Sequence, residues 1–478
     1  METITPNVNM KHITLHVLSI TLGSLNAGYQ AGVMNSMAQT CQYLYKWSDG
    51  QRDTNMNIAS SILTIIATIS SLWGSFIVKR LGRRGMLMLA NILAIIACVT
   101  ISFQTFICLI IGRILFGVMM GFFFYLCPLF TRESVPPYCG GFYGSFHQLM
   151  IVTGIGIAYA LSLFLPNEEE LHAGVQACWR QIFWVPAIVS LLQIFLFLVF
   201  FKNDTPKSLF LKGNTEQCAN TLKDVYKNNK DVLAAIEGFK EEKDMNDNIT
   251  FSTLFSKTKN IIGICLFLAI FQQLSGINSI TYFSTNIFNT VLKNDRQAII
   301  ATALLGAVQI MFTFISLFIV DRLGRKKLFI IGSVLCGLAM GMFGYYYKPN
   351  SENVPIWKEY CCIGAMGFFF ISFALTHGPL CWIYLGEVMH QKTLPIAVAG
   401  NLLFNVITVM WTLPLVGRMK EWFFYMYGMC MAICLVMCII FVKETKGLTD
   451  KEIQQIYSNS NDNALAEKSS LLNKAMNK

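Results

Sequence analysis

The sequence predicts an all-α membrane protein with about twelve transmembrane helices in two six-helix bundles. The first observation behind this is composition: of 478 residues, 54% are hydrophobic and only 13% are charged, and the mean hydropathy is +0.51. A soluble domain carries roughly 25% charged residues, so this chain has more apolar surface than water tolerates. The second observation is a series of long apolar stretches, and the third is a tetrapeptide that returns in the second half.

The apolar stretches have the length of membrane-spanning helices. About 20 residues of helix cross about 30 Å of hydrocarbon, and a helix satisfies its own backbone hydrogen bonds in lipid. The first stretch lacks a small-residue cleavage site, which predicts a retained span rather than a removed signal peptide. We expect spans near residues 13–36, 56–78, 85–104, 107–127, 140–164, 179–201, 260–290, 297–320, 327–347, 358–387, 395–417 and 421–442.

The charged residues predict the orientation in the membrane. The formal net charge of +10 lies largely in short connectors such as Lys79–Arg84 and Asp321–Lys327. This bias is typical of cytosolic loops, so nucleic acid is not an expected partner. An even number of spans then places both termini in the cytosol. The glycosylation sequons at Asn203 and Asn248 would also be cytosolic and therefore unmodified.

The sequence gives no sign of catalysis or of a cofactor. Its 15 cysteines lie mostly in apolar stretches without metal-ligand spacing, so we interpret them as small hydrophobic residues. No glycine-rich loop with Lys-Ser or Lys-Thr indicates an ATP-driven pump. No nucleophile–base pair or carboxylate pair stands out either. We therefore expect neither an enzyme nor a bound metal or cofactor.

An internal repeat divides the chain. Arg80-Leu81-Gly82-Arg83 returns as Arg322-Leu323-Gly324-Arg325, each after the second span of its half, and Glu133 after the fourth span is matched by Glu387 after the tenth. Between the halves lies a polar interval with helical spacing of apolar residues, typical of short amphipathic helices. We expect an N-terminal bundle over 1–201, a cytosolic linker with short helices over 202–259, a C-terminal bundle over 260–443 and a cytosolic tail over 444–478.

Polar side chains in the seventh span predict a site for a polar solute. The stretch FQQLSGIN carries Gln272, Gln273 and Asn278 inside an apolar run, and Gln148 and Gln309 lie on other spans. On a straight helix Gln273 and Asn278 would lie about 140° apart, so Gly276 predicts a break that brings them together. Amides both donate and accept hydrogen bonds, as a neutral polyol requires. The alternative is that these amides are interhelical hydrogen bonds worth about 0.6–2 kcal/mol each.

Short motifs recur along the chain in a characteristic order. They are Gly28–Val33, Gly74–Arg84, Gly112-Arg113 with Gly117 and Gly121, Pro128–Pro136, His147–Leu149, Trp179-Arg180, Gln272–Asn278, Gly378-Pro379 with Trp382, and Glu444–Gly447. Together they resemble the sugar porter family of the major facilitator superfamily over nearly the whole chain. The resemblance implies the major facilitator fold and transport of a hexose by alternating access, as in the facilitative glucose transporters and the parasite hexose transporters.

The resemblance also implies roles for individual residues. Gln148, Gln272, Gln273 and Asn278 would bind sugar hydroxyls, Trp382 would stack on the sugar, and Gln309 stands where an asparagine is usual. Tyr282, Phe283 and Pro379 would gate the site. Leu403-Phe404 replace an Asn-Trp pair, so a hydrogen-bonding group is lost unless Asn401 or Asn405 reaches in. At the cytosolic helix ends, salt bridges among Arg83, Arg84, Glu133, Arg325 and Glu387 would tie the halves together when the inner gate is closed.

Two features bear on energy coupling and on the sugar. Proton-coupled relatives carry an Asp near the position of Gln30, paired with the arginine that matches Arg113, and an amide cannot titrate. We therefore expect a uniporter for glucose, with fructose as a further candidate because Ala269-Ile270-Phe271 replaces a Gln-Leu-Ser typical of glucose-selective relatives. The alternatives are a proton symporter, with His147, His377 or Glu387 as titrating groups, and a sugar sensor of the same fold.

The expected address is the plasma membrane, with the protein embedded in lipid. Glu467, Leu471 and Leu472 in the tail fit an acidic dileucine signal for sorting adaptors. The endosomal or vacuolar membrane is therefore the alternative address.

Overall fold

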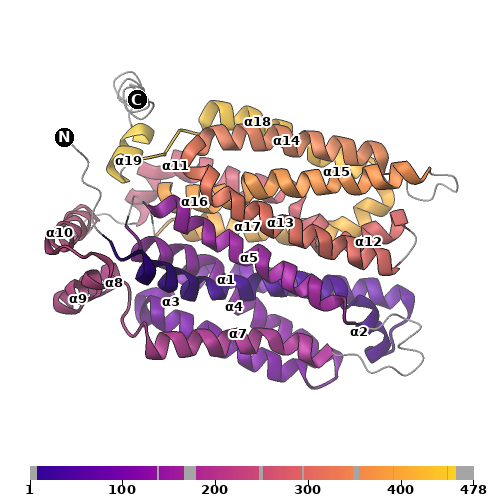
Figure 1. Cartoon of the computed structure of the whole chain (residues 1–478), viewed down its shortest axis with the longest axis horizontal. Helices are drawn as coiled ribbons and strands as arrows, with labels where there is room; N and C mark the ends of the chain where they lie inside the picture. The colour runs from indigo at the N-terminus through magenta and orange to yellow at the C-terminus, as the bar shows by residue number, and fades with distance from the viewer. Residues whose placement is uncertain are drawn as a thin grey trace.

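The computed structural model describes residues 8–136, 139–165, 179–246, 251–292, 295–347, 355–390, 392–448 and 450–458. In these ranges nearly every residue is helical, and the extended structure is limited to one isolated bridge between Val8 and Tyr226. The long helices run roughly side by side (Figure 1). The all-α prediction is therefore confirmed.

The described part of the first half contains five long helices and one short one. The longest helix, α3, holds two of the predicted spans, because Gly82 has φ 78° and ψ 175° and interrupts the helical backbone between them. The helices are α1 (Met10–Ser36), α2 (Ala38–Tyr45), α3 (Asp49–Ile101), α4 (Phe106–Ser134), α5 (Gly140–Ser162) and α7 (Trp179–Val199).

Three short helices connect this half to the second, which ends in a further short helix. The connecting helices are α8 (Pro206–Leu211), α9 (Thr215–Val225) and α10 (Asn229–Asn246). The second half consists of α11 (Phe251–Gln273), α12 (Ile277–Leu292), α13 (Asp295–Leu323), α14 (Arg325–Tyr346), α15 (Ile356–Leu375), α16 (His377–Val388), α17 (Leu394–Met419), α18 (Trp422–Phe441) and α19 (Asp450–Ser458).

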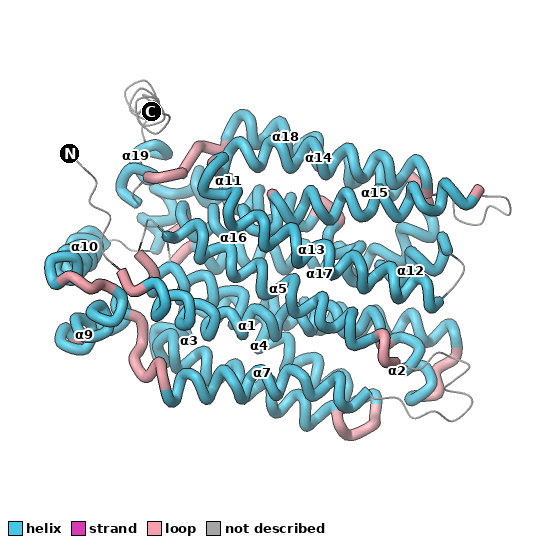
Figure 2. Tube along the Cα trace, in the orientation of Figure 1, coloured by secondary structure: helices cyan, strands magenta, loops and turns pink. Residues whose placement is uncertain are grey.

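The two halves lie against each other, and each is a group of roughly parallel helices. In Figure 1 the indigo-to-magenta helices of the first half occupy one side and the orange-to-yellow helices of the second half the other. The short helices α8, α9, α10 and α19 gather at one end of the molecule, which we call the linker end, while α2 lies at the opposite end (Figure 2). The exact boundaries of bundles, linker and tail stay predictions.

The burial pattern is that of a membrane protein. Large apolar side chains point outward, with Ile107 71% exposed and Phe164 74% exposed, while the polar Gln30, Asn91 and Arg113 are fully buried. Ten helical segments are long and apolar enough to span a membrane, and one of them, Gly50–Ile101, contains two spans. With α1, the described helices account for the expected twelve spans, so the chain is a multi-pass membrane protein.

Close helix packing surrounds the centre of the first half. A Cβ atom on Gly28 of α1 would lie 2.0 Å from the Ile151 carbonyl oxygen of α5, and one on Gly154 would lie 2.1 Å from the Leu25 carbonyl oxygen. Small residues allow such approach where lipid supplies no hydrophobic driving force between helices. The two helices are thereby held backbone to backbone, which places the next turns of α5 at the interface with the second half.

Candidate functional site

Two helix breaks bring polar groups into the middle of the second half. Gly276 has φ +90° between α11 and α12, a conformation that favours glycine, and it is packed against the Tyr427 ring. The break predicted at Gly276 is confirmed. A second break at Thr376, with φ −130° and ψ −94°, separates α15 from α16. Both breaks leave backbone groups that need partners from side chains.

The predicted substrate residues line one cavity between the halves. Helices α1, α4 and α5 contribute one wall, and α11, α12, α13, α15, α16 and α17 contribute the other. Asn401 and Asn405 of α17 also line it, whereas Leu403 points outward and is 50% exposed. The predicted residues that line the cavity are Gln148, Gln272, Gln273, Asn278, Gln309 and Trp382.

Four amide side chains of the second half are hydrogen-bonded to one another. Gln272 donates through Nε2 to the carbonyl oxygens of His377 (3.1 Å) and Gly378 (3.2 Å), which lie at the start of α16 just after the break at Thr376. Asn401 Nδ2 donates to Gln272 Oε1 at 2.8 Å, and Gln273 Nε2 donates to Asn401 Oδ1 at 2.8 Å. Asn278 in turn donates to Gln273 Oε1. The amides of α11 and α12 thus form one chain with α16 and α17.

An aromatic wall stands across from this amide chain. The Trp382 ring lies 5.3 Å from the Phe124 ring and 5.0 Å from the His147 ring, measured between centroids. His147 is itself held by Ser24, 2.8 Å from Nδ1. Since α4, α5 and α16 each supply a ring, the wall joins both halves of the molecule. An apolar face of this kind suits the C–H face of a sugar ring.

Three buried polar atoms on the cavity wall have no partner within the described part of the chain. They are Thr281 Oγ1, Gln309 Oε1 and Asn405 Oδ1, each on a residue at most 5% exposed. A buried polar atom without a partner costs about 1–3 kcal/mol, so a ligand or water that bonds to it is favoured. The described lining includes no charged side chain. The cavity is therefore suited to a neutral molecule with many hydroxyl groups.

The proposed gating residues lie close to this cavity rather than on its described wall. Tyr282 is buried on α12 next to Thr281. Pro379 is buried in the first turn of α16. The side chain of Phe283 lies outside the described residues, as does the dileucine segment at Glu467, Leu471 and Leu472. The gating roles stay predictions.

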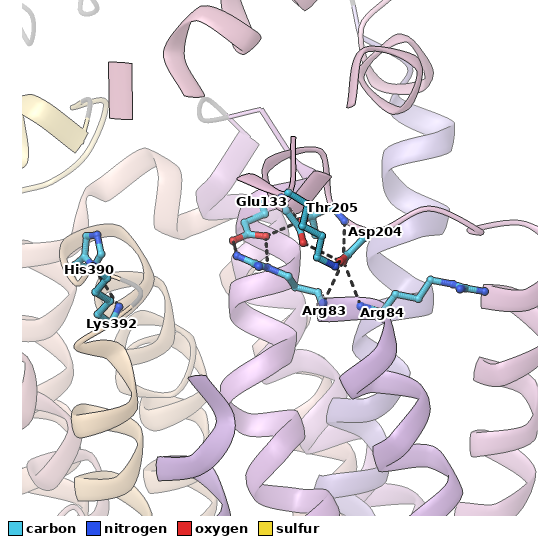
Figure 3. A network of polar contacts seen from close by, with 9 residues as sticks. Arg83, Arg84, Glu133, Asp204, Thr205, His390 and Lys392 are labelled. Atoms are coloured by element: carbon cyan, nitrogen blue, oxygen red, sulfur yellow. Dashed lines mark hydrogen bonds and ion pairs between the residues drawn. The ribbon is translucent and has the colours of Figure 1, made fainter. Parts of the chain in front are cut away.

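A charged network closes the linker end of the first half (Figure 3). Arg83 donates to both carboxylate oxygens of Glu133, at 2.6 and 2.8 Å, and Thr205 donates to Glu133 Oε2 at 2.6 Å. Asp204 accepts the backbone N–H groups of Arg83 (3.1 Å) and Arg84 (3.3 Å), where the second part of α3 begins after Gly82. A carboxylate at a helix start is favoured by the free N–H groups and the helix dipole.

The second half repeats this network. Arg325 pairs with Glu387 at 2.7 Å, Thr445 donates to Glu387 Oε2 at 2.7 Å, and Glu444 accepts the backbone N–H groups of Arg325 (2.8 Å) and Lys326 (3.1 Å). The repeat found in the sequence is thus also a repeat of contacts. Asp204-Thr205 and Glu444-Thr445, which follow the last span of each half, are equivalent.

The described ion pairs of the predicted network each lie within one half. Arg83 is joined to Glu133 and Arg325 to Glu387, and the role of this network in tying the halves together stays a prediction. A described contact between the halves is made instead at Gly141 of α5, where a Cβ atom would lie 2.1 Å from Asp321 Oδ1. The reason is geometric, since each carboxylate follows a span that packs against the arginine of its own bundle.

Burial and charge act in opposite directions on the two arginines. Burial by itself lowers the pKa of Arg83, but the Glu133 carboxylate raises it, and the net pKa lies above its ordinary value. The pKa of Arg325 is raised in the same way by Glu387. Both guanidinium groups therefore stay charged at any physiological pH.

A third arginine is buried, and its described partners include no carboxylate. Arg113 donates through Nη1 to Gln30 Oε1 at 2.9 Å and through Nε to the Ala59 carbonyl at 3.0 Å. Its Nη2 has no partner in the described ranges. Those ranges also contain no group of three His, Cys, Asp or Glu side chains placed to hold a metal ion.

Sequence reasoning missed some of the residues that form the site. Asn401 and Asn405 were foreseen only as replacements for a lost pair, although their spacing of one helical turn puts them on one face of a helix. Thr281 and Phe124 were not foreseen, because each is an ordinary residue of an apolar span. The break at Thr376 was not foreseen either, since no glycine occupies that position.

Known proteins resemble this chain over most of its length. It is 28% identical over 465 residues to "Hexose transporter 1" of Plasmodium yoelii yoelii, which covers 90% of each chain. It is 29% identical over 471 residues to "Solute carrier family 2, facilitated glucose transporter member 1" of Gallus gallus, which covers 92% of each. A solved structure of the proton:xylose symporter XylE bound to 6-bromo-6-deoxy-D-glucose has a TM-score of 0.82 at 25% identity, covering 94% of this chain and 100% of that one.

The family comparison agrees with these relatives. The model described as "Sugar (and other) transporter" matches residues 16–457, which include every helix that contributes to the cavity. The chain belongs to the sugar porter family of the major facilitator superfamily, and it is a sugar transporter rather than an enzyme.

Proposed function

We propose that the protein is a facilitative hexose transporter, a uniporter that moves glucose, with fructose as a second candidate, down its gradient by alternating access. The observation that carries the uniport mechanism is the pairing of Arg113 with the neutral amide of Gln30 at 2.9 Å. An arginine keeps its proton and an amide has none to release, so this pair cannot take up and discharge a proton during transport. The uncharged cavity lining supports a neutral substrate.

Contacts on both sides of the cavity support alternating access. Toward the linker end, Gly141 of α5 packs against Asp321 of α13. Toward the opposite end, the Tyr159 hydroxyl of α5 donates to the Thr281 carbonyl of α12, and Gly156 packs against Ile310. Helix α5 thus touches the second half above and below the sugar site. Opening one side requires only the contacts on that side to separate, while the other set keeps the halves together.

The linker end is the cytosolic end in this proposal. The basic connectors around Arg83 and Arg325 lie there, as the positive-inside rule requires. Both termini are then cytosolic, and the plasma membrane is the proposed address. Absence of a glycan on Asn203 and Asn248 in a secretory host supports this orientation, and a glycan on either one contradicts it. Sorting adaptors that recognise Leu471 and Leu472 would divert the protein to an endosomal or vacuolar membrane.

One observation favours a second candidate, a proton-coupled symporter. The solved structure with a TM-score of 0.82 is that of a proton:xylose symporter. In this chain His147 is buried beside Trp382, and its Nε2 has no partner in the described part of the chain. A histidine that gains and loses a proton there would link sugar binding to protonation.

Uptake in cells that lack their own hexose transporters tests these candidates. Labelled glucose and fructose are supplied with and without a protonophore, and external pH is recorded. We expect saturable uptake that stops at equal concentrations, is unaffected by the protonophore and leaves external pH unchanged. Accumulation above the external concentration with alkalinisation of the medium means a symporter. Sugar binding to the purified protein without uptake means a sensor.

A further inference from the structure

Asn401 holds the amide chain of the sugar site together. It is 1% exposed and lies in the second turn of α17, opposite the end of α11. Its Nδ2 donates to the Ala269 carbonyl at 2.7 Å and to Gln272 Oε1 at 2.8 Å, while its Oδ1 accepts from Gln273 Nε2 at 2.8 Å. It is the link through which two neighbouring glutamines of α11 contact each other.

Backbone carbonyls determine which way this chain of amides points. A carbonyl oxygen can only accept, so the group of Asn401 that faces Ala269 must be its NH₂. Its oxygen is then turned toward Gln273. The carbonyls of His377 and Gly378 hold the NH₂ of Gln272 in the same manner, and this turns Gln272 Oε1 toward Asn401. No other arrangement of these two amides satisfies all of the groups.

The orientation of the Asn401 amide also fixes the orientation of the amides that face the cavity. Because Asn401 presents an oxygen, Gln273 must present its NH₂ to Asn401, and its Oε1 therefore accepts from Asn278 Nδ2. Because its oxygen is used, Gln273 has only its second N–H, a donor, left for the cavity, whereas Asn278 keeps Oδ1 as an acceptor together with its own second N–H. With an amide free to rotate by 180°, each could present either a donor or an acceptor.

We propose that Asn401 is a positioning residue that determines the hydrogen-bonding polarity of the sugar site, so that Gln273 presents a donor and Asn278 an acceptor to the substrate. This inference rests on the proposed function, in that both residues bind the sugar. It assigns to one hydroxyl of the hexose the role of acceptor and to another the role of donor. The specificity for the sugar then depends on Asn401, because Asn401 fixes the orientation of the Gln273 amide.

Two substitutions separate this role from simple packing. Asn401→Leu has a similar volume but offers no acceptor, so the Gln273 amide is no longer held in one orientation. Asn401→Asp keeps an acceptor for Gln273 and loses the donor for Ala269 and Gln272. The matched control is Leu403→Ala on the same helix, whose side chain points to lipid and is 50% exposed.

Deoxy and deoxyfluoro glucoses are the probes. A fluorine substituent accepts weakly but cannot donate, so it replaces a hydroxyl that accepts from Gln273 and fails to replace one that donates to Asn278. Each analogue, modified at positions 2, 3, 4 or 6, competes with labelled glucose for uptake and for binding to purified protein. A neutral hydrogen bond is worth about 0.5–1.5 kcal/mol, or about two- to tenfold in affinity. The ratio of two affinities measured in one variant does not depend on the abundance of that variant at the membrane.

In the unmodified protein and in Leu403→Ala, we expect one position at which the deoxyfluoro sugar binds about three- to tenfold better than the deoxy sugar. The ratio of the affinity for the deoxyfluoro sugar to that for the deoxy sugar falls below about twofold in Asn401→Leu. The same ratio is kept in Asn401→Asp, although Asn401→Asp binds every sugar more weakly. An unchanged ratio in Asn401→Leu overturns the inference, and so does an equal loss of ratio in both variants. If the unmodified protein neither binds nor transports any hexose, the proposed function itself has failed.

Discussion

Arg113 and Gln30 form a buried pair in which a full positive charge is balanced by dipoles. The guanidinium Nη1 lies 2.9 Å from Gln30 Oε1 and 3.2 Å from the Gln30 carbonyl oxygen, and neither residue is exposed. A charged side chain inside a membrane costs about 2.5–3.5 kcal/mol even on the lenient insertion scale. The cost is met by three hydrogen bonds from Arg113 rather than by a counter-charge.

Replacing Gln30 by Asp should introduce sensitivity to pH. A carboxylate beside Arg113 gives a group that is ionised when paired and can bind a proton when the helices separate. We expect sugar uptake by Gln30→Asp to increase as the external pH is lowered from 7.5 to 5.5, with alkalinisation of the medium during uptake. The unmodified protein and Gln30→Asn should show neither effect. Identical pH profiles for all three proteins would contradict this role for the pair.

Removing either amide of α11 should weaken sugar binding, and removing one of them should also lower the stability of the protein. Gln273→Ala removes a donor from the cavity, and we expect the half-saturation concentration to rise about three- to tenfold. Gln272→Ala should in addition lower the melting temperature of the purified protein, because it removes the hydrogen bonds that join α11 to the His377 and Gly378 carbonyls of α16 and to Asn401 of α17. Both should reach the membrane in similar amounts, measured by surface labelling. Unchanged uptake in both variants would contradict the site assignment.

The two equivalent ion pairs should differ in their contribution to stability. The Glu133 side chain is 2% exposed, whereas that of Glu387 is 23% exposed. Breaking a buried pair costs about 3–5 kcal/mol, and solvent reduces the cost of a half-exposed one. We therefore expect Glu133→Gln to lower the melting temperature of the purified transporter more than Glu387→Gln. A larger decrease in melting temperature for Glu387→Gln than for Glu133→Gln would mean that burial does not determine how much each ion pair contributes to stability.

Gly82 should not tolerate a side chain. Its φ of 78° with ψ of 175° lies in a region essentially limited to glycine, and a Cβ atom there would lie 2.3 Å from Asp204 Oδ2. Gly82→Ala should therefore destabilise the protein by about 1–3 kcal/mol. The matched control is Gly341→Ala in α14, where a Cβ atom would meet nothing within 4 Å. Thermal unfolding in detergent compares the two, and equal melting temperatures would show that Asp204 moves aside without cost.

Local sequence patterns were enough to predict the helices and six of the residues that line the cavity. Twenty apolar residues in a row have few alternatives in lipid, so the spans could be placed from length and hydropathy. The break at Gly276 was predictable because a glycine stands between amides that a straight helix would separate. The break at Thr376 was missed, although Pro379 in the first turn of α16 has no backbone N–H with which to continue α15. Only the folded chain brings the distant Gln272 to the start of α16.

The repeat of Arg83 and Arg325 with Glu133 and Glu387 illustrates the same limit. Their positions after equivalent spans predicted a shared role, and the structure confirms that they are paired. The pattern alone does not contain the information that each pair lies within one half, since that depends on which helices are neighbours. Asp204 and Glu444 joined the network for the same reason, because only the fold brings the last span of each half back to its Gly-containing turn.

The sequence by itself determined that this chain crosses a membrane about twelve times, that its halves are related, and that amides near Gly276 belong to a polar site. These properties follow from composition and spacing, which act over a few turns of one helix. The tertiary structure alone decided that Asn401 connects Gln272 to Gln273, that Trp382 faces Phe124 and His147, and that Arg113 rests on Gln30. Hydrogen bonds and ring contacts between distant helices depend on how those helices cross, and no single segment specifies the crossing.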